Sequence, residues 1–339
     1  MPLNSSEYII PNGRKFDILK LLLAFLVVAI HTTPVTDYLR PLYRIAVPLF
    51  FLMSSYFFFL KLSVISSPKE KKKALKHFSV RIIKLYLFWT IALLPWIIYQ
   101  QKWYVLTFET IFKIVKSVFI SGTFGGAWYL TATIISIFLI WCLSQKISNK
   151  KLLFVGFISY SICCLTSNYI SLFTSSPLFV AFYKGYSFLF GTPSNSFLAP
   201  LFFVVIGKIL AENKLVFTNK VLYICLFLSA IFLFAESFVV TSNKLNFNSI
   251  HFADDCYFCL IPFCVTLFMI IGQKQVYVNF ETKFLRQYST IIYCSHITVK
   301  DAVVFCGDFC TTSLMCICLC FMITQLEKFQ RFRWLKYSH

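Results

Sequence analysis

A histidine and a lysine interrupt an otherwise hydrocarbon-like stretch near the beginning of the chain. The stretch reads KLLLAFLVVAIHTTPV, with Lys20 as its first residue and His31 near its far end. An ionisable side chain at the centre of a bilayer costs about 3 kcal/mol or more to insert, so such a residue needs a compensating role. The imidazole of His31 is suited to general acid or base catalysis. We therefore take His31 as the first candidate catalytic residue.

Further polar residues fall on the same side of the bilayer as His31. At about 1.5 Å per helical residue, His31 lies roughly 22 Å into a hydrocarbon core about 30 Å thick, whereas Lys20 lies near its inner surface. The residues on the outer side are Arg44, Trp128, Tyr129, Asn195, Glu236, Asp254 and Asp255, and His296 lies near mid-depth. Burial in one cavity, with charges paired, costs less than exposure to lipid. The sequence therefore predicts a polar cavity suited to proton transfer.

Most of these residues also have an ordinary structural interpretation when each is taken alone. Arg44 could extend to the interface, and Trp128 and Tyr129 could belong to an interfacial aromatic belt. His296 could be a hydrogen-bonded buried histidine. Glu236 has few such explanations, because it is a carboxylate inside the apolar stretch IFLFAESFVV.

The chain has 13 cysteines, most of them inside apolar runs. We interpret most of them as small hydrophobic side chains of helices. Cys256 and Cys259 form a Cys-x-x-Cys pair with no second pair at zinc-ligand spacing, so we expect no metal site. A disulfide of this pair with Cys306 or Cys310 stays open as an alternative.

The composition indicates the elements that must position these residues. Of the 339 residues 58% are hydrophobic and 13% are charged, with a mean hydropathy of +0.75. Soluble domains are nearer half apolar and a quarter charged, so we expect an integral membrane protein. The net charge of +19 would suggest nucleic acid for a soluble chain. Here it favours cytoplasmic loops facing anionic membrane lipid, and we expect no nucleic-acid partner.

The hydrophobic pattern predicts an all-α polytopic protein with about ten transmembrane helices. The expected spans are 16–36, 44–62, 80–100, 126–145, 151–168, 196–211, 219–240, 254–272, 286–303 and 308–326. Residues 107–121 are expected to form an interfacial helix, 169–195 the longest connection and 327–339 a basic cytoplasmic tail. Most of the 32 Lys and Arg residues fall on one side, which predicts that both termini are cytoplasmic. The run KEKKKALKH at 69–77 is expected to be a solvated loop that fixes this topology.

Several motifs, in this order, resemble those of acyltransferase family 3, the bacterial integral-membrane enzymes that O-acylate cell-surface sugars. Lys20 and His31 fit a pattern of a basic residue, ten residues and histidine. The other matching segments are RIAVPLFFLMSSYF at 44–57, RIIK at 81–84, AWYL at 127–130, NSFLAPLFFVVIGKIL at 195–210 and FLRQYSTIIYCSH at 284–296. The resemblance covers about residues 14–326 and implies a single membrane domain.

The resemblance implies a ten-helix fold and a cytoplasmic acyl-CoA donor, usually acetyl-CoA, with no permanently bound cofactor. The acceptor would be a surface polysaccharide or another hydroxyl compound at the outer face of the bacterial cytoplasmic membrane. His31 takes the position of the catalytic histidine, and Lys20, Arg81 and Lys84 take basic positions near the donor. The chain departs from the family where Ser55 replaces glycine, where Lys84 replaces arginine, and where Ser194-Asn195-Ser196 replaces Arg-Asn-Gly.

From this pattern we assign hypothetical roles. His31 would act as general base or, alternatively, carry the acyl group; Glu236 or Asp255 would orient it, and Arg44 or Tyr129 would stabilise the oxyanion. The residues expected to line the acceptor cavity are Trp128, Tyr129, Asn195, Tyr293 and His296. Rival functions are a transporter or flippase for a lipid-linked sugar and a structural or sensory subunit. The oligomeric state stays open, with a homodimer as one alternative.

Overall fold

The computed structural model describes residues 13–32, 39–105, 107–213, 217–246, 255–273, 280–302 and 307–339. Every regular element within these residues is a helix, which confirms the all-α prediction. Each of the ten expected apolar segments contains a helix. These helices are α1 (Gly13–Thr32), α3 (Ala46–Ser63), α4 (Pro68–Ala92) with α5 (Leu94–Gln100), α7 (Ala127–Leu143), α8 (Asn149–Leu165), α10 (Leu198–Glu212), α11 (Asn219–Ser242), α12 (Leu260–Gln273), α13 (Lys283–Ala302) and α14 (Phe309–Leu326).

Shorter helices connect the long ones. They are α2 (Arg40–Tyr43), α6 (Phe108–Lys116), the π-helical turn η1 (Ser117–Ser121), η2 (Ile170–Leu172), α9 (Pro177–Phe190), η3 (Pro193–Asn195) and η4 (Gln330–Ser338). The expected helix at 107–121 is therefore present as α6 and η1, with Thr107 as N-cap. Its interfacial location stays a prediction.

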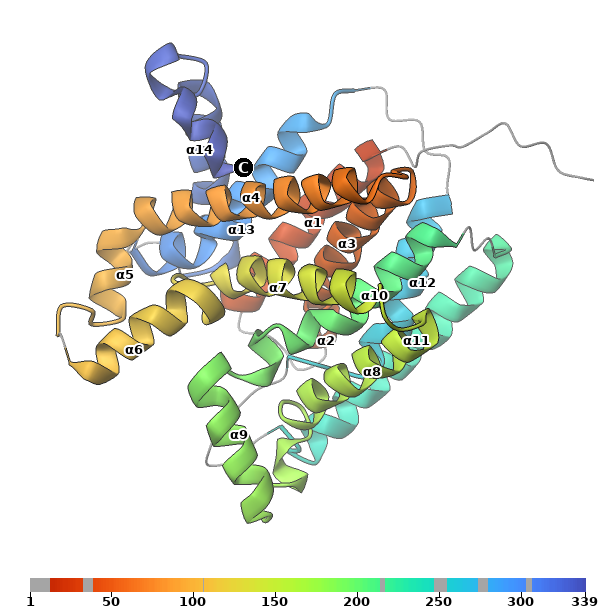
Figure 1. The fold of residues 1–339 in the computed structure, drawn as a ribbon. Helices are drawn as coiled ribbons and strands as arrows, with labels where there is room; N and C mark the ends of the chain where they lie inside the picture. Colours follow the sequence, from red (N-terminus) through yellow and green to blue (C-terminus); the bar gives the residue numbers. More distant parts are fainter. Residues whose placement is uncertain are drawn as a thin grey trace, which may run out of the picture.

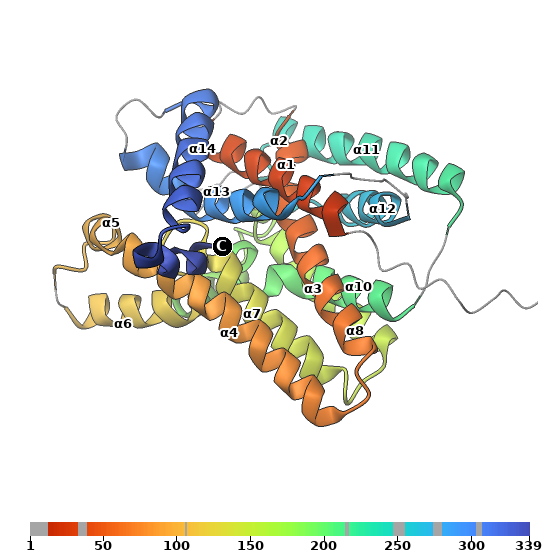
Figure 2. The ribbon, with the colours of Figure 1, turned by 90° about the horizontal axis from the view of Figure 1, so that it is seen from above.

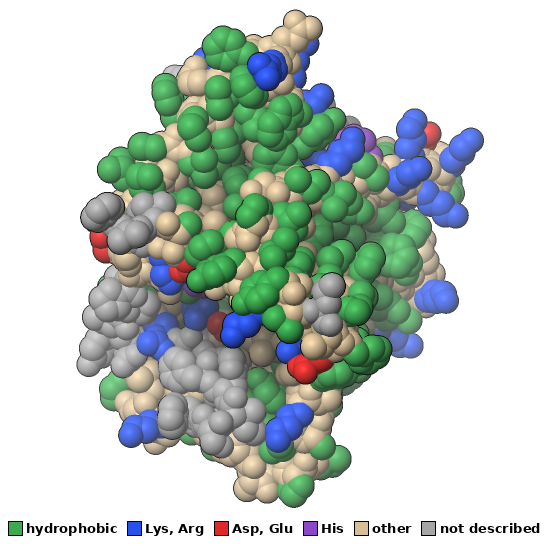
Figure 3. Space-filling model, turned by 90° about the vertical axis from the view of Figure 1, so that its left-hand side faces the viewer, with side chains coloured by type: hydrophobic (Ala, Val, Ile, Leu, Met, Phe, Trp, Pro, Cys, Tyr) green, Lys and Arg blue, Asp and Glu red, His purple; other side chains and the backbone are tan. Residues whose placement is uncertain are grey.

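Three spans among the described residues are long and apolar enough to cross a membrane, and two bent pairs raise that number to five. The single spans are Arg40–Ser63, Asn219–Ser242 and Phe309–Leu326; the bent pairs are Pro68–Ala92 with Leu94–Gln100, and Pro177–Asn195 with Leu198–Glu212. In Figure 3 hydrophobic side chains cover most of the visible face, and charged side chains gather around a hollow in its lower half. These features support a membrane protein, while the crossing of all ten segments and the cytoplasmic termini stay predictions.

Helix α4 begins earlier and ends sooner than the sequence indicated. It starts at Pro68, so the lysine-rich run expected as a solvated loop lies on its first turns. After Ala92 the chain bends by 70° into α5. Pro95, in the first turn of α5, has no N–H to donate to a carbonyl four residues earlier, so the helix breaks before it. The third expected span is therefore two helices.

Part of the expected connection 169–195 is also helical. Helix α9 begins at Pro177, and Ser176 Oγ accepts a hydrogen bond from Phe179 N at 3.4 Å. A serine N-cap followed by proline at the first helical position is a common helix start. The expected connection therefore contains a helix whose start signal was readable in the sequence.

Close helix packing holds the centre of the bundle. Helix α3 packs on α10, α10 packs on α8, and α1 packs on α13, while α4 and α11 lie on opposite sides of the molecule (Figures 1 and 2). A methyl group on Gly207 of α10 would meet the Ser55 hydroxyl and lie 2.9 Å from Leu52 O. Glycine at position 207 therefore makes room for Ser55, the residue that replaces the family's usual glycine on α3.

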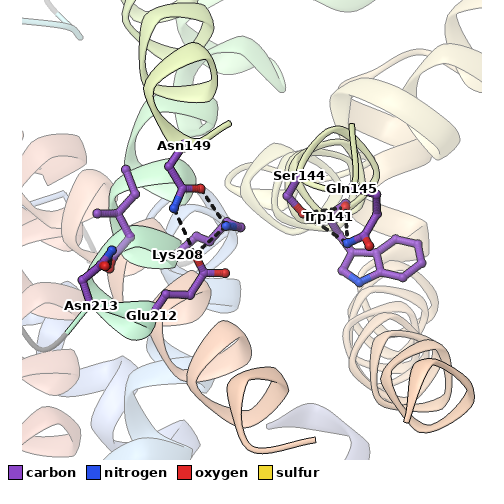
Figure 4. Close-up of polar contacts among 8 residues, drawn as sticks. Trp141, Ser144, Gln145, Asn149, Lys208, Glu212 and Asn213 are labelled. Carbon is purple, nitrogen blue, oxygen red and sulfur yellow. Dashed lines mark hydrogen bonds and ion pairs between the residues drawn. The ribbon is translucent and has the colours of Figure 1, made fainter. Parts of the chain in front are cut away.

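A polar cluster ties the end of α10 to the beginning of α8 (Figure 4). Lys208 Nζ donates hydrogen bonds to Glu212 Oε2 at 2.6 Å and to Asn149 Oδ1 at 2.8 Å. Asn149 Nδ2 donates to the same Glu212 oxygen at 3.2 Å. The Lys208 side chain is only 7% exposed, so this buried ammonium has its acid and amide partners in place.

The chain after α14 is folded rather than a free tail. Helix η4 packs on α4 and on α14. Trp89 Nε1 donates a hydrogen bond to Ser338 O at 2.9 Å, and Leu335 is buried. The expected basic tail is thus a packed element, although its basic residues remain exposed.

Candidate functional site

Two histidines from opposite ends of the chain meet where α1 packs on α13. The ring centroids of His31 and His296 lie 5.2 Å apart. His296 is buried, and its Nδ1 lies 2.8 Å from Tyr293 O and 3.2 Å from Ile292 O. Two carbonyl oxygens at Nδ1 require a hydrogen on that nitrogen, so Nε2 of the neutral ring carries the lone pair. Nε2 has no hydrogen-bond partner among the described residues, which makes it available as a proton acceptor.

An ion pair lies next to this histidine pair. Arg44 Nη1 is 2.9 Å from Asp255 Oδ1, and Ser194 Oγ donates to Asp255 Oδ2 at 3.0 Å. The charge of Arg44 also acts on His31. The predicted neighbour Asp254 lies outside the described residues.

The Arg44–Asp255 ion pair lines a small pocket. Its walls include Arg44, Asp255, Trp128 and Asn195, together with Ile30, which immediately precedes His31. The structure therefore brings four predicted site residues together around one pocket, next to the predicted catalytic histidine.

Glu236 lies outside this pocket lining and has a different set of contacts. Its Oε1 accepts hydrogen bonds from Phe258 N at 2.7 Å and from the Tyr169 hydroxyl at 2.8 Å. Its Oε2 accepts from Cys259 N at 2.7 Å. The carboxylate thus binds backbone N–H groups just before α12, where unpaired helical donors need acceptors.

The same segment is held from the end of α8. Ser167 Oγ accepts a hydrogen bond from Asp255 N, and Asn168 Oδ1 accepts one from Cys256 N, both at 3.0 Å. Together with Glu236, these contacts fix the backbone that carries Asp255 to Arg44. Glu236 therefore positions the ion pair.

Tyrosines connect the histidine pair to the interior of the bundle. The Tyr129 hydroxyl lies 3.1 Å from Ser54 Oγ, and its ring centroid lies 5.2 Å from that of Tyr293. Tyr293 in turn lies 6.1 Å from His296 and donates its hydroxyl to Gly126 O at 3.1 Å. Gly126 has a φ of 84°, which glycine adopts readily, and α7 starts directly after it. This turn places Tyr129 in the first turn of α7.

A group of basic residues lies beyond the tyrosines. The charges of Arg81 and Arg286 both act on Lys20, and Arg81 and Tyr129 also interact electrostatically. Lys20 Nζ is 3.6 Å from the carboxylate of Asp17. Arg286 was not among the predicted site residues, although it stands in the matching motif FLRQYS.

Lys84 is placed apart from this basic group. Its Nζ lies 5.3 Å from the ring centroid of Tyr337, in η4. Lys84 therefore lies outside the basic group of Lys20, Arg81 and Arg286, and its predicted contact with the donor stays a prediction.

The described residues contain no group of three or more His, Cys, Asp or Glu side chains that could hold a metal ion. The twelve cysteines within the described ranges form no disulfide with one another. Cys306, one of the alternatives for a disulfide, falls outside them.

Comparison with known proteins gives one match over nearly the whole chain. The profile of the family described as "Acyltransferase domain" matches residues 14–324. This range coincides closely with the region in which the motifs were recognised. No solved structure is significantly similar to the chain.

Three curated relatives are similar over part of their length. A serine/alanine racemase of Enterococcus gallinarum is 28% identical over 200 residues, which are 56% of this chain and 28% of the relative. An amino-acid racemase of Enterococcus faecalis is 29% identical over 57% of this chain and 27% of the relative. A second from that organism is 24% identical over 75% of this chain and 36% of the relative. The chain thus spans between 27% and 36% of the length of these relatives.

Proposed function

This chain belongs to the acyltransferase family whose profile spans it, and from that premise we propose that it transfers an acyl group from cytoplasmic acyl-CoA to a hydroxyl acceptor outside the cell membrane. The acyl group is acetyl and the acceptor a glycan of the cell envelope. We do not assign the racemase activity named for the relatives to this chain, because the chain covers less than two thirds of their length.

The observation that carries the proposal is a polar column through the helix bundle. It begins at Lys20, Arg81 and Arg286, continues through the Tyr129–Tyr293 pair, and reaches His31 and His296 beside the Arg44–Asp255 pocket. A polar column of this kind in a membrane protein needs a function. It offers a donor entering from one end a route to an acceptor entering from the other.

Basic groups at one end of the column suit the phosphates of coenzyme A. Lys20, Arg81 and Arg286 interact with one another, and this clustering of positive charge favours an anionic ligand. Arginine can bind phosphate through two parallel hydrogen bonds, which lysine cannot do. The thioester at the end of the pantetheine arm would then extend past Tyr129 toward His31.

The histidine pair would supply the proton chemistry. His31 takes the proton of the acceptor hydroxyl while the oxygen attacks the thioester carbon. A carbon–oxygen bond forms, the carbon–sulfur bond breaks, and the proton passes to the coenzyme A thiolate. Arg44, oriented by Asp255, stabilises the negative charge that develops on the carbonyl oxygen.

The test is an acyl-transfer assay with purified protein in proteoliposomes. Radiolabelled acetyl-CoA is supplied on one side, and envelope glycans and free serine are offered as acceptors on the other, serine because of the name of one relative. Labelled product is expected with the native protein, whereas His31→Ala abolishes it without changing thermal stability. Turnover by His31→Ala would contradict the catalytic assignment.

The donor site is tested separately. Arg81→Ala and Arg286→Ala are expected to raise the KM for acetyl-CoA about tenfold, because each removes a charge-assisted hydrogen bond to phosphate. The matched control is Lys150→Ala, which removes an exposed lysine in the first turn of α8. Unchanged KM values in both arginine variants would place the donor elsewhere.

A transporter or flippase for a lipid-linked sugar is the second candidate. The same polar column favours it, because ionisable residues across a membrane also serve as proton relays. Proton-coupled sugar flux without thermal stabilisation by acetyl-CoA or CoA would support transport. Stabilisation by CoA together with labelled product supports the acyltransferase.

A further inference from the structure

An apolar pocket lies between α4, α13, α14 and η4, away from the polar column's own pocket. Its volume is about 360 Å³, and only apolar atoms face it. Phe88 and Trp89 of α4 form one wall, Val299 of α13 and Ile323 of α14 form others, and Leu335 of η4 closes one side. Nothing in the acyl-transfer proposal uses this pocket.

Two small residues at helix ends contribute to the pocket wall. Ala92 ends α4 just before the 70° bend, and Ala302 ends α13. Both residues line the pocket. Ser295 and Thr298 are also part of the wall, but their polar atoms do not face the pocket. A water molecule needs two to four polar partners to remain in a cavity, and this pocket offers it none. The pocket therefore suits hydrocarbon.

Positive charge borders this pocket. Lys84 Nζ and Lys336 Nζ lie 5.3 Å and 5.1 Å from the same ring centroid, that of Tyr337. Both lysines are exposed, and within the described ranges neither forms an ion pair with a carboxylate. Lys336 directly follows the pocket residue Leu335, and Lys84 precedes Phe88 by one helical turn. Each ammonium group lies within cation–π distance of this ring, and an anion close to both would offset their mutual repulsion.

Helix η4 holds this arrangement in place. Trp334 packs on Phe88 with ring centroids 5.7 Å apart, and Trp89 Nε1 binds Ser338 O. Gln287 Nε2 and His339 Nε2 lie 2.6 Å apart, which links the end of η4 to α13. The pocket wall and the lysine pair are thus part of one folded unit.

We propose that this pocket is a binding site for an anionic phospholipid, with one acyl chain in the pocket and the phosphate between Lys84 and Lys336. Apolar walls beside paired cations fit an amphiphile with a long hydrocarbon chain and a negatively charged head. The lipid fills the space between η4 and the three helices and fastens η4 to them. The site is independent of whether the chain transfers acyl groups.

The experiment measures quenching of tryptophan fluorescence by lipids brominated in the acyl chain, in proteoliposomes. Trp89 and Trp334 line the pocket, and Trp334→Phe identifies the part of the signal that comes from there. Brominated phosphatidylglycerol is expected to quench this part at a lower mole fraction than brominated phosphatidylcholine. Lys336→Gln is expected to reduce that preference about fivefold, as for removal of one lysine at an anionic lipid surface.

Two variants fill the pocket and two serve as controls. Ala92→Phe and Ala302→Phe are expected to remove the Trp334 quenching, whereas Ala235→Phe on the exposed face of α11 and Lys146→Gln after α7 leave it unchanged. Ala302→Leu replaces Ala302→Phe if the larger side chain lowers the melting temperature.

Three outcomes would overturn the proposal. Equal quenching by the two lipids would show that the site does not recognise an anionic head group. Unchanged quenching in both Ala→Phe variants would show that no acyl chain occupies the pocket. Displacement of the brominated lipid by palmitoyl-CoA, but not by CoA, would assign the pocket to the acyl chain of a long donor instead.

Discussion

For the His31–His296 pair, the two residues could be predicted from the sequence but their contact could not. His31 could be predicted from its type and depth, and His296 was predicted only as a cavity residue. Their contact could not be predicted, because it depends on the packing of α1 on α13. The orientation of the His296 ring is also a structural finding, set by two backbone carbonyls of its own helix.

We predict that His296→Ala lowers kcat for acyl transfer about a hundredfold and leaves the KM for acyl-CoA unchanged. The reason is that the His296 ring lies beside His31 and its Nε2 has no partner among the described residues, while the basic group that would bind the donor is untouched. Steady-state kinetics in proteoliposomes check this. His77→Ala, on the exposed side of α4, is the matched control and should behave like the native protein. A rise in KM alone would mean that His296 binds substrate instead.

Glu236 or Asp255 was expected to orient His31, and the observed hydrogen bonds of Glu236 are to the backbone before α12. The sequence shows a carboxylate inside an apolar helix but not the amides of Phe258 and Cys259 that it accepts from. Those donors belong to a turn whose position depends on the packing of α11 against α12. The carboxylate of Glu236 is half-buried, and its hydrogen-bond partners could not be read from the sequence.

We predict that Glu236→Gln destabilises the protein by about 1–3 kcal/mol, because one of the two half-buried backbone N–H groups at this carboxylate loses its acceptor. Acyl transfer should fall with it, since the Arg44–Asp255 pair is no longer held in place. Thermal melting in detergent, measured beside the transfer rate, checks both effects. Glu109→Gln, at an exposed ion pair with Lys113, should change neither. A variant with native stability and no activity would instead restore Glu236 to the catalytic group.

At the scale of elements, the cluster of Lys208, Glu212 and Asn149 joins two helices that the sequence shows only as separate apolar segments. Glycine and hydrophobic residues account for most of the contact of α10 with its neighbours. The cluster adds a directional link at one end, because each of its three side chains binds the other two.

We predict that Glu212→Gln lowers the free energy of unfolding more than Lys208→Met does. Glu212→Gln leaves the buried ammonium of Lys208 without its carboxylate and should cost about 3 kcal/mol. Lys208→Met leaves Glu212, which is partly exposed and can be hydrated, so it should cost less. Melting temperatures check the order, with Glu70→Gln at an exposed pair on α4 as control. Equal losses in the two variants would contradict this explanation.

The boundaries of α4 and α9 show what local signals can and cannot supply. Pro95 and the Ser176-Pro177 pair were readable in the sequence, and each correctly marks a helix end or start. The helical state of the lysine-rich turns at the beginning of α4 was not readable, because like charges on neighbouring turns disfavour a helix locally. The buried contacts of Leu75 and Ile82 further along α4 supply the compensating stability.

At the scale of the whole molecule, composition and apolar runs were sufficient for an all-α membrane protein, and motif order was sufficient for the family. The folded η4 could not be predicted, because its sequence is basic and short. It packs through Leu335 and Trp334 against helices that are distant in the chain. Long-range contacts of this kind leave no periodic signal in the sequence.

The lysine-rich first turns of α4 have a consequence for the kinetics of the whole protein. Lys72, Lys73 and Lys76 are exposed on a helix that also carries Arg81 further along. An anionic donor diffusing near the membrane would be drawn toward this helix before any specific contact forms, and added salt screens that attraction. We therefore predict that kcat/KM for acyl-CoA falls as ionic strength rises while kcat stays constant. Replacing the three lysines with glutamine should make kcat/KM less dependent on salt. These turns would then control the rate at which the donor is captured and not the rate of the chemical step.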